Sequence, residues 1–282
     1  MGITLTAINF YPVKGLKGIA LEEAHCTDRG IAHDRRWMVV DAEGIFMSQR
    51  SHPRMATVWT DLSGGMLVLS APDEDSVEIP LEPPRAPSMK VQVWNSIVDA
   101  IPASRTADLW LSNYLESPCR LVYMPDDSVR YSNNKYAGEG NRVGFADGYA
   151  YLAIGESSLA DLNSRLAAKN HPALPMNRFR PNFVLSGTDA YAEDRFGEVR
   201  VGSAAFRGVK PCGRCQVTTT DQATGEVMGP EPLLTLSSYR DSPEFGQMFG
   251  MNMVSVREGK VRVGDRVQPA DVGAFLQHGA PR

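Results

Sequence analysis

Short apolar runs separated by turn residues dominate the first hundred positions of the chain. Turn residues at 41–44, 63–65 and 95–96 each lie between two such runs, and the run at 56–60 reads as a strand. Regular hairpin spacing of this kind favours a β-barrel or a β-sandwich. The proline-rich stretch 79–87 predicts a loop or an edge strand, because proline cannot donate to a strand ladder. The N-terminal region is therefore expected to be mainly β.

A change of period marks the end of this region. Over residues 104–115, Leu111 and Tyr114 fall on one face at helical spacing, and Ser104 is well placed to cap a helix. A strand over 119–123 is expected to follow, again from its apolar residues.

A long polar segment separates the two halves of the sequence. Residues 124–146 carry glycines and show no period, and a loop this long in a compact chain is usually functional or mobile. It is either a substrate entrance or plain disorder. We expect a β-rich N-terminal domain over residues 1–120 and a second domain over residues 121–282.

The second half mixes strands with a few helices. A strand over 149–154 precedes a helix over 157–169, where Ser158 and Asp161 match a capping box. Strands at 183–185, 199–201, 205–208 and 215–220, a short helix at 232–240 and a hairpin at 260–267 complete the predicted elements. The fold class predicted for the whole chain is α+β, mainly β, with a β-barrel-like domain at each end.

Composition narrows the partners and the compartment. The chain has 282 residues, is 43% hydrophobic and carries a net charge of −4, which gives no basic excess to attract a nucleic-acid polymer. No apolar run approaches the roughly 20 residues of a membrane helix, and the first residues do not resemble a signal peptide. We therefore expect a cytoplasmic protein with no membrane or nucleic-acid partner.

The segment Lys210 to Cys215 carries the most chemical information. Four interpretations of Cys212 and Cys215 are open. They could be inert core residues, half of a zinc site, a redox dithiol, or a source of thiolate for a soft metal. The chain's five histidines show no zinc-ligand spacing. The β-branched residues after Cys215 predict a strand, which would deprive a redox dithiol of a helix N-terminus. Arg214 would favour the thiolate. Residue chemistry alone leaves the last two interpretations nearly equal.

A set of short motifs resembles the MOSC-domain family, in the branch of the amidoxime-reducing component and related bacterial proteins that reduce N-hydroxylated bases. The resemblance runs from Asn9 to Val267, and its strength lies in the order and joint presence of the motifs. They are residues 11–18, 34–37, 145–149, 158–163, 179–182, 191–194, 210–215 and 231–233.

The resemblance implies a MOSC N-terminal β-barrel domain, a MOSC domain, and a molybdenum–pterin cofactor (Mo-molybdopterin) between them. Cys215 would be the protein ligand to molybdenum. The other implied cofactor contacts are Lys14, Gly15, Arg35, Gly148, Tyr149, Arg180, Asn182, Cys212, Gly213, Arg214 and Met248. Arginine suits the cofactor's phosphate, because its planar fork binds phosphate with two parallel hydrogen bonds.

The implied activity is the reduction of N-hydroxylated compounds: hydroxylaminopurines, amidoximes and N-oxides. Asp147 matches an active-site aspartate of the family, and we expect an anionic cofactor to raise its pKa and make it a proton donor. No cysteine follows Cys215, so no iron–sulfur cluster is expected in this chain. Electrons would come from a separate reductase or from a heme or iron–sulfur protein. The alternative is a cofactor or sulfur carrier of the sulfurase type, without reductase turnover.

Overall fold

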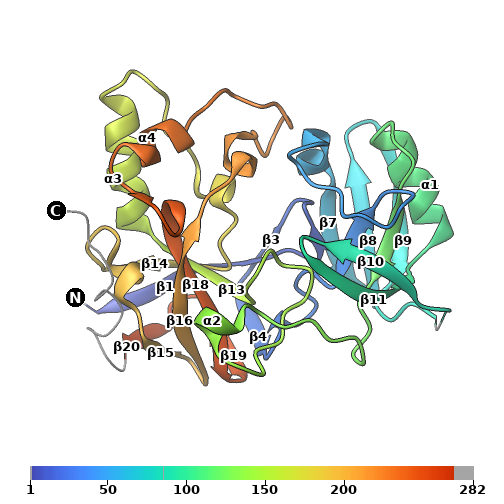
Figure 1. Cartoon of the computed structure of the whole chain (residues 1–282), viewed down its shortest axis with the longest axis horizontal. Helices are drawn as coiled ribbons and strands as arrows, with labels where there is room; N and C mark the ends of the chain where they lie inside the picture. The colour runs from blue at the N-terminus through green and yellow to red at the C-terminus, as the bar shows by residue number, and fades with distance from the viewer. Residues whose placement is uncertain (1, 85, 270–282) are drawn as a thin grey trace.

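The computed structural model describes residues 2–84 and 86–269 of the chain. Two β-rich halves lie side by side in Figure 1, and helices cover only part of their surface. The expected α+β class with a β majority is confirmed. No helix within these ranges is both long enough and apolar enough to cross a bilayer.

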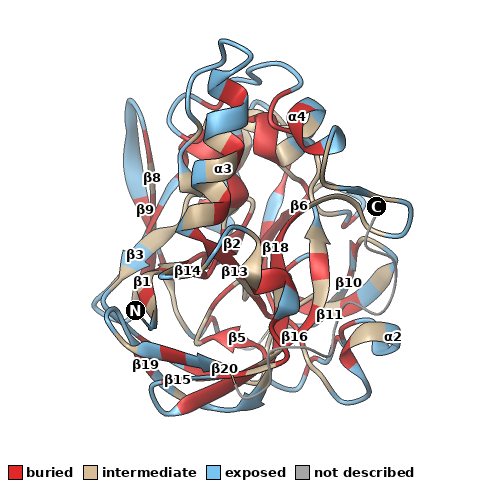
Figure 2. Cartoon of the chain, turned by 90° about the vertical axis from the view of Figure 1, so that its left-hand side faces the viewer, coloured by how far each residue is buried: buried red, intermediate tan, exposed pale blue. Residues whose placement is uncertain are grey.

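Seven strands close a barrel in the half on the left of Figure 1. Their order is β13 (Tyr151–Gly155), β14 (Phe183–Ser186), β1 (Ile3–Phe10), β20 (Arg266–Pro269), β15 (Glu198–Val201), β16 (Ala204–Gly213) and β18 (Gly246–Arg257). β18 also pairs with β13, which completes the ring and removes the exposed sheet edges. The interior is aromatic, with Tyr151 stacked on Phe183 and both in contact with Phe206. Figure 2 shows the buried segments gathered on these strands.

The barrel takes one strand from the very start of the chain. β1 runs antiparallel to β14 and to β20, so the first strand lies in the sheet of the later residues. Four short strands flank the barrel: β3 (Ile19–Leu21), β4 (Glu23–Thr27), β5 (Gly30–Ile31) and β17 (Asp241–Ser242). The division into residues 1–120 and 121–282 stays a prediction, and the sheets do not follow it strictly.

The predicted hairpin over 260–267 is wrong. β19 (Gly259–Arg262) pairs with β4, whereas β20 pairs with β1 and β15. The turn between them docks on Leu5, whose backbone exchanges hydrogen bonds with Gly264 and Asp265 at 2.8 and 2.9 Å. Tertiary pairing therefore takes the backbone groups that a hairpin ladder would have used.

The other half contains two sheets and one long helix. A five-stranded sheet has the order β10 (Met89–Val93), β11 (Ser96–Pro102), β12 (Arg120–Tyr123), β6 (Trp37–Val40), β2 (Val13–Lys14). A three-stranded sheet contains β7 (Trp59–Ser63), β8 (Met66–Ala71) and β9 (Glu74–Pro80). The predicted strand at 56–60 begins only at β7, because residues Pro53–Thr57 form the 3-10 helix η1.

Helix α1 (Arg105–Tyr114) confirms the predicted helix and its cap. The Ser104 hydroxyl accepts a hydrogen bond from the Ala107 N–H at 3.2 Å, and Leu111 and Tyr114 are buried. The helix packs against β9 and β12 and covers one side of this half.

The remaining helices lie around the barrel. They are α2 (Asn134–Ala137), α3 (Glu156–Ala167), α4 (Leu233–Ser237), η2 (Met176–Phe179), η3 (Ala192–Arg195) and η4 (Gln216–Thr219). The predicted capping box is wrong, because Gly155 occupies the N-cap of α3 and Ser158 is buried inside its first turn. The Ser158 hydroxyl donates instead to the buried Glu193 carboxylate at 2.9 Å.

The predicted strand over 215–220 is also wrong, because η4 occupies this position. The Thr218 hydroxyl donates to the Cys215 carbonyl at 3.0 Å, and the Thr219 hydroxyl donates to the Gln216 carbonyl at 2.8 Å. Threonine side chains that bond nearby backbone offer an alternative to a sheet ladder. Local hydrogen bonding thus outweighs β propensity in this segment.

The segment 124–146 is ordered and ends next to Asp147. Arg130, from its middle, donates to the carbonyl oxygens of Gly144, Ala146 and Asp147 at 2.9, 2.5 and 2.8 Å. Its Nε donates to Ser96 Oγ at 3.3 Å. Burial lowers the pKa of Arg130 to about 10. One buried guanidinium therefore holds the backbone on which Asp147 stands.

Replacing Arg130 tests this arrangement. Arg130→Met keeps the side-chain length but leaves three carbonyl oxygens without their donor, so we expect the free energy of unfolding to fall by about 3 kcal/mol. Arg130→Lys retains the charge without the planar fork and should lose less. Urea denaturation followed by circular dichroism measures the difference, and an unchanged midpoint for Arg130→Met would show that the guanidinium is dispensable.

Candidate functional site

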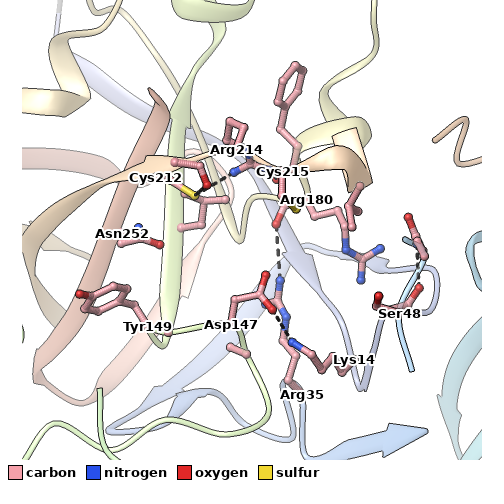
Figure 3. A pocket seen from close by; sticks show the side chains of 18 of the residues that line it. Lys14, Arg35, Ser48, Asp147, Tyr149, Arg180, Cys212, Arg214, Cys215 and Asn252 are labelled. Carbon is pink, nitrogen blue, oxygen red and sulfur yellow. Dashed lines mark hydrogen bonds and ion pairs between the residues drawn. The ribbon is translucent and has the colours of Figure 1, made fainter. Parts of the chain in front are cut away.

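A cleft between the two halves brings the predicted site residues together. Its empty volume is about 930 Å³, counted to the open mouth. The predicted residues that line it are Lys14, Gly15, Arg35, Asp147, Gly148, Tyr149, Arg180, Asn182, Cys212, Gly213, Arg214 and Cys215. Figure 3 shows side chains from both halves converging there.

Met248 is the predicted site residue that does not line the cleft. Its N–H donates to the Arg240 carbonyl at 2.9 Å, and its carbonyl accepts from Arg240 Nε at 3.3 Å. It also pairs with Gly213, which does line the cleft, in the barrel sheet. Lys210 likewise faces elsewhere, with its ammonium over the rings of Tyr136 and Phe245.

Both cysteines of the pair are free and half-buried at the cleft. β16 ends at Gly213, where a Cβ atom would lie 2.0 Å from the Phe245 carbonyl oxygen, so this turn has no room for a side chain. Cys215 then occupies the N-cap position of η4. A 3-10 helix of four residues adds little dipole to its terminus, so it gives the redox dithiol interpretation scant support.

Arg214 links Cys212 to Phe179 at the cleft wall. Its Nη1 donates to Cys212 Sγ at 3.1 Å and its Nη2 to the Phe179 carbonyl at 2.6 Å. Its Nε is buried and has no hydrogen-bond partner among the described residues. Buried polar atoms are normally paired, so this donor is free for a ligand acceptor.

Two further arginines pack on one buried ring. The guanidinium carbons of Arg35 and Arg180 each lie 4.3 Å from the centre of the Tyr11 ring. Both residues have left-handed backbone, with φ of 48° and 54°, a conformation unusual for a residue with a long side chain. Burial lowers the pKa of Arg180 to about 10. Local strain that persists next to a cleft is typical of functional positions.

Asn182 serves the protein more than the cleft. It is 1% exposed, and its side chain accepts from the Leu152 N–H and from Arg35 Nη1, both at 3.2 Å. Its amide nitrogen donates to the Asn9 carbonyl at 3.2 Å. It therefore fixes Arg35 and joins the backbones of Leu152 in β13 and Asn9 in β1.

Asp147 forms a short ion pair with Lys14 and accepts a hydrogen bond from Trp94 Nε1 at 3.1 Å. Desolvation in the cleft raises the pKa of the Asp147 carboxyl group. The charge and hydrogen bond of Lys14, helped by Trp94, outweigh it and hold the pKa well below its usual range. The expected rise concerns the carboxyl group next to an anionic cofactor, and it stays a prediction.

The proton of this pair lies on Lys14. Burial lowers the pKa of the Lys14 ammonium, and the charge of Asp147 offsets part of that effect. The Lys14 side chain is 8% exposed, whereas that of Asp147 is 70% exposed toward the cleft.

Several lining residues carry no signal in the sequence. Phe46, Ser48, Gln49, Arg50 and Trp94 come from loops of the first half and also line the cleft. The Gln49 amide donates to the Gly15 carbonyl at 2.7 Å and exchanges hydrogen bonds with Gln222 from the other half. No motif or period marks these positions, because only the tertiary fold brings them to the site.

The donor set suits an anionic group held through sulfur. Two free thiols, four guanidinium groups, one of them with an unpaired N–H, and open space beside Gly148 share the cleft. No group of three or more His, Cys, Asp or Glu side chains in the described ranges is arranged to hold a metal alone. Cys26 is buried in the barrel core and does not line the cleft, so it adds no third zinc ligand to Cys212 and Cys215.

Comparisons with known proteins agree with these observations. The MOSC N-terminal beta barrel domain matches residues 2–118, and the MOSC domain matches residues 140–268. Human mitochondrial amidoxime-reducing component 1 is 33% identical over 94% of this chain and 82% of its own. A tomato molybdenum cofactor sulfurase is 29% identical over 94% of this chain and 35% of its own.

Among solved structures, the YUAD protein of Bacillus subtilis is 10% identical, with a TM-score of 0.40 over 95% of this chain and 94% of its own. That likeness carries no argument about function. The identity and coverage of the amidoxime-reducing components, together with the two domain matches, show that this chain belongs to the MOSC-domain family that contains them.

Proposed function

We propose that this protein binds a molybdenum–pterin cofactor through Cys215 and reduces N-hydroxylated compounds such as hydroxylaminopurines, amidoximes and N-oxides. The observation that carries the proposal is the free thiol of Cys215 in a cleft lined by four arginines. When bound, the cofactor supplies the two-electron chemistry that removes oxygen from nitrogen. Electrons come from a separate reductase or from a heme or iron–sulfur protein.

Three of these arginines, Arg35, Arg180 and Arg214, are assigned to the anionic end of the cofactor. Arg35 and Arg180 are held by the Tyr11 ring, and Arg214 keeps an unpaired buried N–H. Fixed guanidinium groups bind phosphate without first losing side-chain freedom, and the half-buried cleft weakens screening by solvent.

Close approach of a flat ring system is assigned to the glycines and to Tyr149. Gly15, Gly148 and Gly213 present backbone rather than side chains, and a Cβ built at Gly148 meets no described atom within 4 Å. Tyr149 also lines the cleft. Cys212 and Asn182 are assigned indirect roles, because Cys212 positions Arg214 and Asn182 positions Arg35.

The Lys14–Asp147 pair is assigned to proton delivery. Lys14 Nζ holds the proton, and Asp147 Oδ1 accepts its hydrogen bond while facing the cleft. The reduction consumes two protons with its two electrons and releases the substrate oxygen as water. A substrate oxygen next to Asp147 would receive these protons through this pair, and Lys14 Nζ takes up a proton from solvent after each transfer.

The names of the relatives support the reductase class, because the amidoxime-reducing components share nearly the whole chain. The sulfurase relative favours the alternative of cofactor or sulfur handling without turnover. The animal relatives are named as mitochondrial, and the cytoplasmic location stays a prediction.

Metal analysis and turnover separate these possibilities. Protein made in a host that synthesises the cofactor should contain about one molybdenum and one pterin per chain, and should reduce benzamidoxime with reduced methyl viologen as electron donor. Cofactor content without turnover would favour the carrier. Absence of both molybdenum and pterin would overturn the proposal.

The two cysteines should differ in their effects. Cys215→Ser removes the proposed metal ligand and should abolish reduction, whereas Cys212→Ser removes only a partner of Arg214 and should keep much of it. Steady-state assays, with molybdenum content measured on the same samples, test this. Equal loss from both substitutions would point to a dithiol mechanism.

The Lys14–Asp147 pair predicts a shift in the pH profile. The charge of Asp147 raises the pKa of Lys14, so Asp147→Asn should lower that pKa further and let Lys14 lose its proton at lower pH. The alkaline limb of kcat should therefore move to lower pH, and kcat at neutral pH should fall by about 10-fold or more.

Asp126→Asn is the matched control, because Asp126 pairs with Arg36 and its side chain is 91% exposed. It should leave the profile unchanged. An alkaline limb that stays in place in Asp147→Asn would exclude Lys14 as the proton source.

A further inference from the structure

Trp94 stands in a backbone conformation that its side chain disfavours. The β10–β11 hairpin pairs Val93 with Ser96, so Trp94 and Asn95 form a two-residue turn. The φ of Trp94 is 54°, in the left-handed region that glycine or asparagine usually fills in such turns. A bulky residue kept at this position points to a requirement other than folding.

The indole of Trp94 is fixed at the cleft. Its Nε1 donates across to Asp147 at 3.1 Å, and its ring lies 5.2 Å from the Phe46 ring. The guanidinium of Arg50 lies over the indole at 4.3 Å. The ring is therefore held from three sides while it remains partly exposed in the cleft.

Arg50 differs from the other cleft arginines. It is exposed, contacts Phe46, Trp94 and Ser48, and pairs with no carboxylate within the described ranges. Arg35 and Arg180 instead pack on Tyr11. The cleft thus holds two separate cationic walls, one around Tyr11 and one around Trp94.

We propose that the wall formed by Phe46, Trp94 and Arg50 selects substrates, favouring flat, conjugated N-hydroxylated compounds over small aliphatic ones. This inference rests on the proposed reductase function. An indole and a guanidinium plane offer a stacking surface that any flat π system can use. The hydrogen bond from Trp94 to Asp147 places that surface directly beside the proposed proton route.

The position of the wall favours a substrate over the cofactor as its ligand. The anionic end of the cofactor is assigned to the Tyr11 wall, next to the cysteine segment that Arg214 ties to Phe179. The Trp94 wall is formed by Phe46, Arg50 and the β10–β11 turn, and it meets Asp147, the more exposed member of the Lys14–Asp147 pair. A ligand lying there touches Asp147, through which Lys14 delivers its proton, and leaves the proposed phosphate site free.

Two substitutions separate stacking from hydrogen bonding. Trp94→Phe keeps an aromatic face but loses the N–H donor to Asp147, whereas Trp94→Leu loses both. In the cofactor-loaded protein, we expect Trp94→Leu to lower the ratio of kcat/KM for benzamidoxime to kcat/KM for acetamidoxime by about 10-fold, because loss of the hydrogen bond to Asp147 affects both substrates whereas loss of the stacking face affects only the flat one. Trp94→Phe should retain most of the preference for benzamidoxime.

Binding provides a readout independent of turnover. Calorimetry without reductant should give a Kd for benzamidoxime that rises by about 10-fold in Trp94→Leu, with unchanged molybdenum and pterin content. Trp59→Leu is the matched control, because Trp59 is 41% exposed outside the cleft, under Lys17. It should change neither quantity.

The outcomes distinguish the two proposals. Equal losses for both substrates, or unchanged benzamidoxime binding in Trp94→Leu, would overturn the selective wall. Wild-type protein that binds benzamidoxime through Trp94 without reducing it would support the wall and contradict the reductase function.

Discussion

A buried ring between two like charges is the interaction on which the site depends. The Tyr11 ring lies between the guanidinium groups of Arg35 and Arg180, and the buried Asp34 carboxylate pairs with Arg35. The Tyr11 N–H donates to Asp34 at 2.7 Å, and the Tyr11 hydroxyl donates to the Pro181 carbonyl at 3.1 Å. Two cations held this close repel each other, and an anion bound between them would relieve that repulsion. The site therefore favours binding of an anion.

The same network joins the two halves of the chain. Arg35 bonds through its backbone to Tyr11 and to Phe145, two residues before Asp147. Arg130 then fixes the carbonyl of Asp147 itself. The cationic wall around Tyr11 and the Lys14–Asp147 pair are thus connected by one hydrogen-bond network, and preorganised electrostatics requires such a connection. The cleft geometry follows from the fold rather than from flexible surface side chains.

Much of the site could be predicted from the sequence, because its motifs keep their residue types and order. The cysteine segment, Arg35, Arg180 and Asp147 all reach the cleft as expected. The state of Asp147 could not be predicted, because it depends on Lys14, 133 positions away, lying against it. The role of Trp94 could not be predicted for a similar reason. A tryptophan in a turn looks like a surface residue until the fold brings Asp147 against it. The prediction of the fold failed where local hydrogen bonding or pairing with distant strands outweighed residue propensity, as at η4 and at the turn docked on Leu5.

The central claim is that the Cys215 sulfur is bonded to molybdenum, and X-ray absorption at the molybdenum edge tests it most directly. Wild-type protein should show one more sulfur neighbour around the metal than Cys215→Ser loaded with the same cofactor. Identical sulfur shells in the two proteins would contradict the account, whatever their activities.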